Sequence, residues 1–282
     1  MRILIAYPWL DLGGAPKTAM ALARGLKERG HEVFFYSRPG GLYQARLEEL
    51  EIPLVEAPHN RLLPAMYQLH RGGYRILRDT LERERIDLVH TFHPHLHYLA
   101  LMAAPARGIP VVFTAVWFLG VTPFPAYPGR VLFVAEEFKD VSGPLFGPWP
   151  REMSVLPNRI ELDHYHPGVG SGDFPERHGL AREGWRIAFM SRVDKNKIGS
   201  LRQAVDAALI LAGRGHDLQL AVAGDGPRME ELRAKARQAN EAAGRPIVRL
   251  LGPVADPVPL LAWADLILGI GRCAWEGMAC AK

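Results

Sequence analysis

The chain has 282 residues, of which 48% are hydrophobic and 23% are charged, and its formal net charge is +4. This is the composition of an ordinary globular protein, so a disordered or fibrous chain is excluded, and no apolar run reaches the roughly 18 residues that a membrane-spanning helix needs. With only 2 cysteines and no signal-peptide pattern at its start, the chain is expected to be cytoplasmic, with any membrane contact peripheral at the inner face.

The first half of the chain alternates short apolar runs with helical stretches. The apolar runs are rich in Val, Ile, Leu and Phe and show little polar alternation, which indicates strands buried on both faces. This alternation predicts a parallel sheet with helices on both faces. The expected strands are residues 2–7, 32–37, 53–57, 87–92, 110–115, 130–135 and 153–156, and the expected helices are residues 15–29, 41–50, 63–85 and 96–107.

A polar stretch rich in proline and glycine, residues 164–184, is interpreted as an interdomain linker, and the same pattern restarts after it. We therefore predict an α/β protein of two Rossmann-like, doubly wound parallel-sheet domains, residues 1–165 and 166–282. The expected strands of the second domain are residues 185–190, 218–223, 247–251 and 266–268, and its expected helices are residues 198–212, 228–243, 258–264 and 273–281.

The second domain is expected to be C-terminally incomplete. A Rossmann domain normally has about six strands in the order 3-2-1-4-5-6, whereas four are expected here, before the chain ends inside a helix. Those four strands would be neighbours in that order, so a half-sheet can form with residues 266–268 at its edge. Such an open edge is expected to lower solubility and stability.

Loops at the carboxyl ends of parallel strands bind ligands in open α/β sheets, and two such loops carry candidate residues. Gly13-Gly14 follows the first strand and would let the backbone approach an anion at a helix start, although a tight loop closure explains the pair equally well. Arg192 and Lys197 follow the strand at residues 185–190 and could converge on a diphosphate, with a solvated basic turn as the alternative.

A third loop, at Gly269 and Gly271, joins the last strand to the last helix. Its backbone amides could bind phosphate oxygens, and Glu276 could accept hydrogen bonds from ribose hydroxyls. Alternatively, Glu276 is a carboxylate that only complements the helix dipole. The segment also satisfies the dinucleotide fingerprint Gly-x-Gly-x-x-Ala, which we disfavour because nicotinamide-binding domains carry it after the first strand of the sheet.

Two further features have simpler interpretations. The histidines at positions 90, 93, 95 and 97 invite a metal hypothesis, but no cysteine or His-Glu-x-x-His motif accompanies them, so no metal site is predicted. Arg71, Arg75 and Arg78 share one face of a helix that could meet acidic lipid or an anionic acceptor, although such a face is more often simply solvated.

In their order along the chain, six motifs resemble those of the retaining glycosyltransferases of family 4, also called group 1, which have the GT-B fold of two Rossmann-like domains. The motifs are Gly13-Gly14 with Gly30-His31-Glu32-Val33, Val155-Leu156-Pro157-Asn158-Arg159-Ile160-Glu161, Ser191-Arg192 with Lys197, Ala223-Gly224-Asp225-Gly226-Pro227, Leu250-Leu251-Gly252-Pro253-Val254 and Glu276-Gly277-Met278-Ala279-Cys280.

The resemblance implies a transferase of glycan biosynthesis that moves a sugar from a nucleoside-diphosphate sugar to an acceptor, with retained anomeric configuration. It implies Arg192 and Lys197 as catalytic residues, which hold the diphosphate and stabilise the charge of the leaving group. It implies no cofactor, no divalent metal and no nucleic-acid partner, and it leaves open a glycan, lipid or small-molecule acceptor. The implied donor-binding residues are Gly13, Gly14, Gly269, Gly271 and Glu276.

The family usually has a glycine where this chain has Arg159, and two further departures matter more. The family has a carboxylate eight residues before the position of Glu276, where this chain has Leu268, and it tends to have a histidine two residues after Thr114, where this chain has Val116. Two alternative hypotheses therefore stand beside the transferase. One is a nucleotide-sugar epimerase of the same architecture, and the other is a non-catalytic nucleotide-sugar-binding protein.

Overall fold

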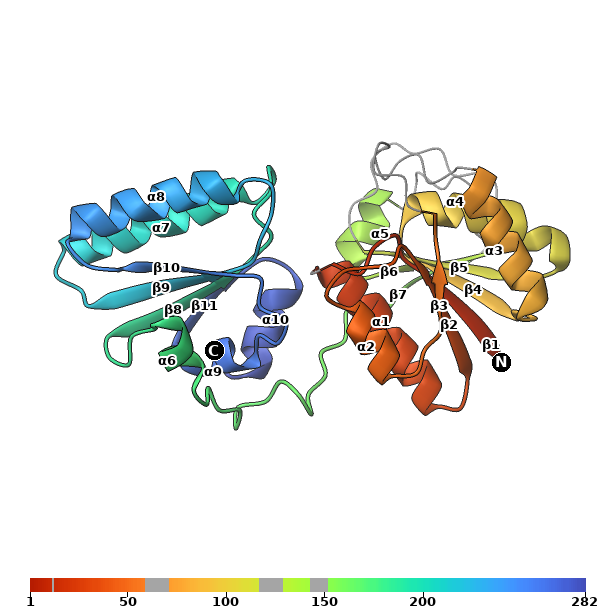
Figure 1. Ribbon diagram of the computed structural model, residues 1–282, viewed down its shortest axis with the longest axis horizontal. Helices are drawn as coiled ribbons and strands as arrows, with labels where there is room; N and C mark the ends of the chain where they lie inside the picture. Colours follow the sequence, from red (N-terminus) through yellow and green to blue (C-terminus); the bar gives the residue numbers. More distant parts are fainter. Residues whose placement is uncertain (12, 59–70, 117–128, 143–151) are drawn as a thin grey trace. The chain divides into compact units, whose positions relative to one another are not determined.

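The computed structural model describes residues 1–11, 13–58, 71–116, 129–142 and 152–282 (Figure 1). The chain divides into two compact units, an N-terminal unit of Met1–Arg159 and a C-terminal unit of Ile160–Lys282. Each unit is a parallel α/β sheet with helices on both faces, which confirms the predicted fold class. The boundary expected at 165/166 lies shortly after the observed division.

The N-terminal unit contains a seven-stranded parallel sheet in the order β3-β2-β1-β4-β5-β6-β7. β1 lies in its interior, paired in parallel with β2 through Ile3 and Val33 and with β4 through Ile3 and Leu88. The strands are β1 (Arg2–Ala6), β2 (Glu32–Ser37), β3 (Leu54–Glu56), β4 (Leu88–Thr91), β5 (Val111–Ala115), β6 (Arg130–Phe133) and β7 (Glu152–Val155), each within two residues of its predicted ends.

Side chains of β1 alternate between two cores, because successive residues of a strand face opposite sides of the sheet. Ile3 and Ile5 are buried with residues of α1 and α2, whereas Leu4 is buried with residues of α3 and α4 (Figure 1). The described helices of this unit are α1 (Gly14–Glu28), α2 (Gln44–Glu49), α3 (Arg71–Arg83), α4 (Pro94–Ala103), the short 3-10 helix η2 (Pro105–Arg107) and α5 (Glu136–Ser142).

The differences from the predicted helices have local causes. α5 was not predicted, because its seven residues are too few to show a helical period. The helix expected at residues 96–107 begins at Pro94, after the His93 N-cap, and its last residues form η2. Residues 63–70 of the third expected helix lie outside the described residues.

The C-terminal unit contains a four-stranded parallel sheet in the order β10-β9-β8-β11, which confirms the predicted half-sheet with the fourth strand at its edge. α7 and α8 cover one face, and α6, α9 and α10 cover the other (Figure 1). The elements are α6 (Phe174–His178), β8 (Trp185–Met190), α7 (Ile198–Gly213), β9 (Leu218–Ala223), α8 (Met229–Ala243), β10 (Val248–Gly252), α9 (Val258–Trp263), β11 (Leu266–Gly269) and α10 (Arg272–Ala279).

The segment interpreted as a linker is folded onto the C-terminal unit, so that interpretation was wrong. Tyr165 and Phe174 are buried in the same core as Trp263 of α9, whose indole N–H donates to the Ala181 carbonyl at 2.7 Å. The segment contains a few buried residues among many polar, proline and glycine residues, and composition alone does not identify them.

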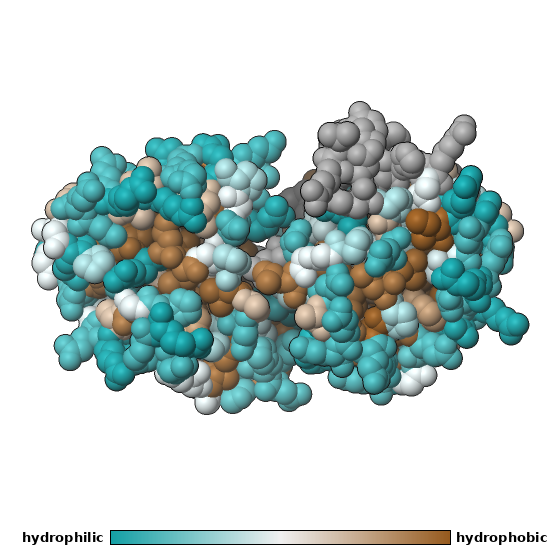
Figure 2. All heavy atoms as spheres, in the orientation of Figure 1, coloured by the Kyte–Doolittle hydropathy of each residue, from teal (hydrophilic) through white to brown (hydrophobic). Residues whose placement is uncertain are grey.

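Polar side chains cover α7 and α8, whereas hydrophobic side chains gather between these helices and the sheet (Figure 2). This is the distribution expected when helices bury one face against a sheet and expose the other. In the described part of the chain, no helix is both long and apolar enough to cross a bilayer.

Histidines are buried at the carboxyl end of the central strands of the N-terminal unit. His90 Nε2 lies 2.7 Å from Thr114 Oγ1, and His97 Nδ1 lies 3.1 Å from Thr91 Oγ1. Burial lowers the pKa of His90 to about 4 and that of His97 to about 3, with the His90 charge as a second cause for His97. Both rings are therefore neutral near pH 7 and serve as hydrogen-bonded core residues.

These two histidines should make the N-terminal unit sensitive to acid. Because an unfolded histidine has a pKa near 6.5, the unfolded state binds more protons than the folded state between about pH 6.5 and pH 4. The free energy of unfolding should therefore fall as the pH falls through this window, by up to ~1.4 kcal/mol per histidine and pH unit. Urea denaturation of the wild type and of His90→Gln and His97→Gln measures this slope.

Each of the two variants should reduce the slope of the free energy of unfolding against pH, whatever it does to the stability at neutral pH. His31→Gln, at a partly exposed position before β2, is the matched control and should keep the wild-type slope. Equal slopes in the wild type and in both core variants would contradict the assignment of the acid sensitivity to His90 and His97.

Candidate functional site

Two loops interlock at the carboxyl edge of the C-terminal sheet, at the ends of β8 and β9. A Cβ atom added to Gly224 would lie 1.8 Å from the Ser191 carbonyl oxygen, and one added to Gly226 would lie 2.4 Å from that of Val193. Val193 N–H donates to the Asp225 carbonyl at 3.0 Å, which closes the contact. Only glycine allows this approach, so the loop after β9 supports the loop that carries Arg192.

Arg192 and Lys197 lie at the two ends of a turn built around Asp194. The Asp194 carboxylate accepts a hydrogen bond from Asn196 N–H at 2.9 Å, and its carbonyl accepts one from Lys197 N–H at 3.1 Å. The Arg192 side chain is exposed, with its Nε 3.8 Å from Asp194 Oδ2, and Lys197 is the half-buried N-cap residue of α7. Lys197 thus lies at the start of a long helix, where the helix dipole favours anions, and Arg192 lies in the loop that leads into this helix.

The start of α10 lies at the same edge of the sheet. Gly271 is its N-cap residue with φ of 70°, a left-handed conformation that suits glycine, and a Cβ on Gly269 would lie 3.2 Å from Ala274 N. The Cys273 thiol donates to the carbonyl of Met190, the last residue of β8, at 3.2 Å. The helix start predicted to bind phosphate therefore adjoins the strand that leads into the Arg192 loop.

Glu276 is buried rather than open to solvent. Its Oε1 accepts a hydrogen bond from Arg272 Nε at 3.0 Å, and both side chains are 5% exposed. Tyr165 lies beside the pair, since burial and then the Glu276 charge raise the pKa of its hydroxyl. Arg272 was missed in the sequence, although its spacing of four residues from Glu276 on a predicted helix was a usable signal.

The glycine pair of the N-terminal unit begins α1, which follows Gly13 as its N-cap. The Thr18 hydroxyl donates to the Gly14 carbonyl at 2.9 Å and lies 3.0 Å from the Asn158 side-chain oxygen. Because a hydroxyl has only one proton to donate, the Asn158 amide satisfies this contact when its NH2 group faces Thr18. This contact joins the glycine loop to the predicted hinge motif.

Leu268 and Val116, two departures from the family pattern, are partly buried residues that pack against apolar clusters. Leu268 of β11 packs with the apolar residues under α7 and α8, and Val116 packs with the cluster that contains Tyr7 and Phe92. Among the residues that the structure describes, no three His, Cys, Asp or Glu side chains gather as a metal-binding group.

One arginine of the basic face of α3 is paired with an acidic neighbour. Arg78 Nη2 lies 2.6 Å from Asp79 Oδ1. This pairing favours the solvated interpretation of the face over attraction to acidic lipid.

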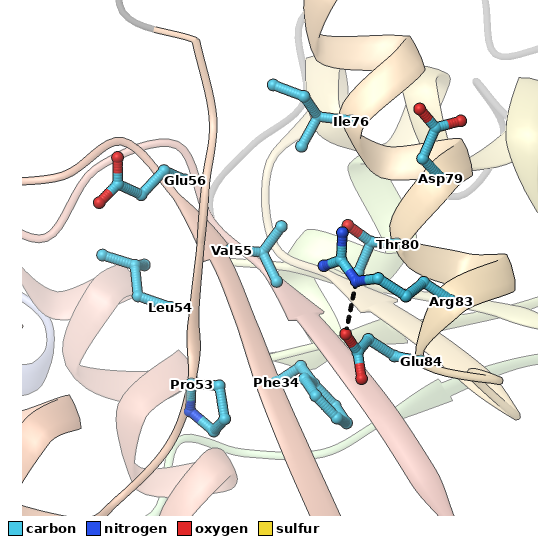
Figure 3. Close-up of a pocket in the computed structure, with 10 residues that line it drawn as sticks. All are labelled: Phe34, Pro53, Leu54, Val55, Glu56, Ile76, Asp79, Thr80, Arg83 and Glu84. Atoms are coloured by element: carbon cyan, nitrogen blue, oxygen red, sulfur yellow. Dashed lines mark hydrogen bonds and ion pairs between the residues drawn. The ribbon is translucent and has the colours of Figure 1, made fainter.

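A pocket of about 320 Å³ opens between α3 and the edge of the N-terminal sheet at β2 and β3 (Figure 3). Within it, Arg83 and Glu84 form an ion pair above Phe34 (Figure 3). It contains none of the predicted site residues. The pocket is lined by Phe34, Pro53, Leu54, Val55, Glu56, Ile76, Asp79, Thr80, Arg83 and Glu84.

Comparison with known proteins supports the same fold. The sequence model described as Glycosyltransferase Family 4 matches residues 12–115, and no curated protein sequence matches the chain. A glycosyltransferase from Rickettsia africae ESF-5 is 17% identical, with a TM-score of 0.77, over 100% of this chain and 77% of that chain. HepE from Anabaena, solved in complex with UDP-glucose, is 19% identical, with a TM-score of 0.79, over 100% and 79%.

Sucrose-phosphate synthase from Thermosynechococcus elongatus is 14% identical, with a TM-score of 0.73, over 99% of this chain and 79% of that chain. The family match confirms the resemblance to family-4 glycosyltransferases over residues 12–115. The structural matches confirm the GT-B fold over the whole chain.

The interlocked loops generate a prediction about Gly224. Gly224→Ala should lower the free energy of unfolding by about 1–3 kcal/mol, because its Cβ cannot fit against Ser191 without a backbone shift. Gly213→Ala, at the end of α7 with open space around it, is the matched control and should be neutral or stabilising by up to about 1 kcal/mol. Urea denaturation compares them, and equal stabilities would refute the close approach.

Proposed function

We propose that the chain is a glycosyltransferase that moves a sugar from a nucleoside-diphosphate sugar to an acceptor hydroxyl, with retained anomeric configuration and without a divalent metal. The observation that carries this proposal is that Arg192 and Lys197 lie in the loop between β8 and α7, with Lys197 at the N-cap of α7. The Cys273 thiol attaches the start of α10 to the end of β8, beside this loop. The UDP-glucose complex of HepE, which shares the fold, supports a nucleotide-sugar donor.

The chemistry follows from charge development on the leaving group. When the bond between the anomeric carbon and the diphosphate oxygen breaks, negative charge builds up on the diphosphate. Arg192 offers a planar fork of donors and Lys197 a compact charge, while the amides at the starts of α7 and α10 add donors. Donors that are already in place stabilise the transition state without reorganisation, which is the main catalytic device in this proposal.

The other donor-binding residues have supporting roles. Gly269 and Gly271 let the backbone at the start of α10 approach the phosphates. Gly13 and Gly14, at the start of α1, are proposed as further donor-binding residues. Glu276, in the second turn of α10, accepts hydrogen bonds from the ribose hydroxyls.

A non-catalytic nucleotide-sugar-binding protein is the second candidate. It is favoured by Leu268 and Val116, which are partly buried against apolar clusters at the positions where the family carries a carboxylate and a histidine. The two candidates differ in turnover. Incubation with UDP- and GDP-sugars, with and without candidate acceptors, should release nucleoside diphosphate in an acceptor-dependent way if the chain is a transferase. Donor binding without release would support the second candidate, and sugar epimerisation without acceptor would support an epimerase.

A thermal-shift screen identifies the donor class. A ligand that binds only the native state raises the apparent melting temperature, and at a concentration of 100 times its Kd it stabilises by about 2.7 kcal/mol. UDP- or GDP-sugars should therefore raise the melting temperature of this chain, whereas the free sugars at the same concentration should not. A melting temperature that no nucleoside-diphosphate sugar changes would contradict the proposed donor class.

Arg192→Ala should weaken the binding of the nucleoside diphosphate by about 1.5–3 kcal/mol, the usual scale for hydrogen bonds to a charged group. Lys195→Ala removes an exposed cation of the same turn and is the matched control, which should bind as the wild type does. Isothermal titration calorimetry with UDP and GDP measures both variants. An unchanged affinity in Arg192→Ala would remove Arg192 from the diphosphate site.

A further inference from the structure

Arg272 and Glu276 are the only Asp, Glu, Lys or Arg side chains that are buried in the described part of the chain. They form an ion pair one turn apart on α10, with Arg272 Nε 3.0 Å from Glu276 Oε1. The ion pair between Arg186 and Asp265, in contrast, leaves its side chains 33% and 28% exposed. The ion pair of α10 therefore differs from this partly exposed pair in being buried.

Stability does not explain why this pair is buried. Removing two charges from water costs about as much as their attraction returns, so apolar residues of similar size usually serve a core equally well or better. Arg272 is also the first residue of α10, where the positive end of the helix dipole disfavours a cation. Because stability does not account for the desolvation of the two charges or for a cation at the helix start, we attribute the burial of the pair to a function of the pair itself.

The surroundings hold the pair in one place. A Cβ on Gly277 would lie 3.1 Å from Ile267 Cβ, so α10 packs closely on β11 (Figure 1). The Cys273 thiol joins the first turn of α10 to Met190 at the end of β8. Tyr165, fully buried, is close enough to sense both charges. The carboxylate of Glu276 therefore has a fixed position on the helix whose start adjoins the Arg192 loop.

We propose that Arg272 is a positioning residue that fixes the Glu276 carboxylate for the ribose hydroxyls of the bound nucleoside diphosphate. The inference rests on the proposed function and deepens it. The hydrogen bond from Arg272 Nε to Glu276 Oε1 holds the carboxylate in one orientation on α10. The guanidinium also offsets a negative charge that would otherwise repel the nearby diphosphate.

The test separates the ribose from the phosphates. The ligands are UDP and GDP, each compared with its 2′,3′-dideoxy analogue, which keeps the diphosphate and lacks the ribose hydroxyls. Arg272→Gln should weaken the binding of UDP or GDP about tenfold, the factor for one hydrogen bond to a charged group, and should leave the dideoxy analogue unchanged. In a Glu276→Gln background, Arg272→Gln should have no further effect.

Two more measurements distinguish positioning from a structural role. Arg272→Lys keeps the charge and should restore part of the ribose-dependent affinity, and it can be measured if Arg272→Gln does not fold. Arg245→Gln, which breaks a surface ion pair with Asp217, should change none of these affinities.

Equal losses for the ribonucleotides and the dideoxynucleotides in Arg272→Gln and Arg272→Lys would overturn the proposal, because they would indicate a phosphate contact or damage to the fold. Wild-type ribonucleotide affinity in both variants would also overturn it. If Glu276→Gln binds ribonucleotides as the wild type does, the ribose role of Glu276 fails as well. The diphosphate site of the proposed function is decided separately by Arg192→Ala, so the two failures are distinguishable.

Discussion

The close approach of two loop backbones organises the carboxyl edge of the C-terminal sheet. Gly224 and Gly226 have no Cβ, so the loop after β9 can lie directly against Ser191 and Val193 after β8. This contact, closed by the hydrogen bond from Val193 to Asp225, supports the turn around Asp194. This turn determines where Arg192 and Lys197 lie in the loop that leads into α7. A side chain at either glycine would move the loop on which the proposed diphosphate chemistry depends.

The second element of the edge is α10, which differs chemically from the Arg192 turn. The turn presents an exposed guanidinium, whereas α10 holds its charges in the interior as an ion pair between Arg272 and Glu276. Exposed cations attract an anionic ligand and adapt to it, while a buried pair has one geometry and resists change. A site that combines the two can capture a diphosphate with one element and discriminate the attached nucleoside with the other.

Most of the fold was predictable from the sequence. Strands such as Trp185–Met190 and Leu218–Ala223 have the predicted ends, because runs of buried apolar residues bounded by glycine and polar residues are typical of parallel sheets. The strand order followed from the usual connections of doubly wound folds. The short helices α5 and α6 were not predicted, since five to seven residues do not show a helical period.

The sequence by itself determined which residues occupy the loops at the carboxyl edge, because a strand, a glycine and a helix start are local signals. Arg192, Lys197, Gly269 and Gly271 were found in this way. Only the tertiary structure decided the burial of each side chain: the ion pair of Glu276 and Arg272 is buried, and Leu268 and Val116 are partly buried against apolar clusters. The four-residue spacing of Arg272 and Glu276 is a local sign of pairing, but burial depends on which elements pack together, and contacts between residues distant in sequence leave no periodic signal in the chain.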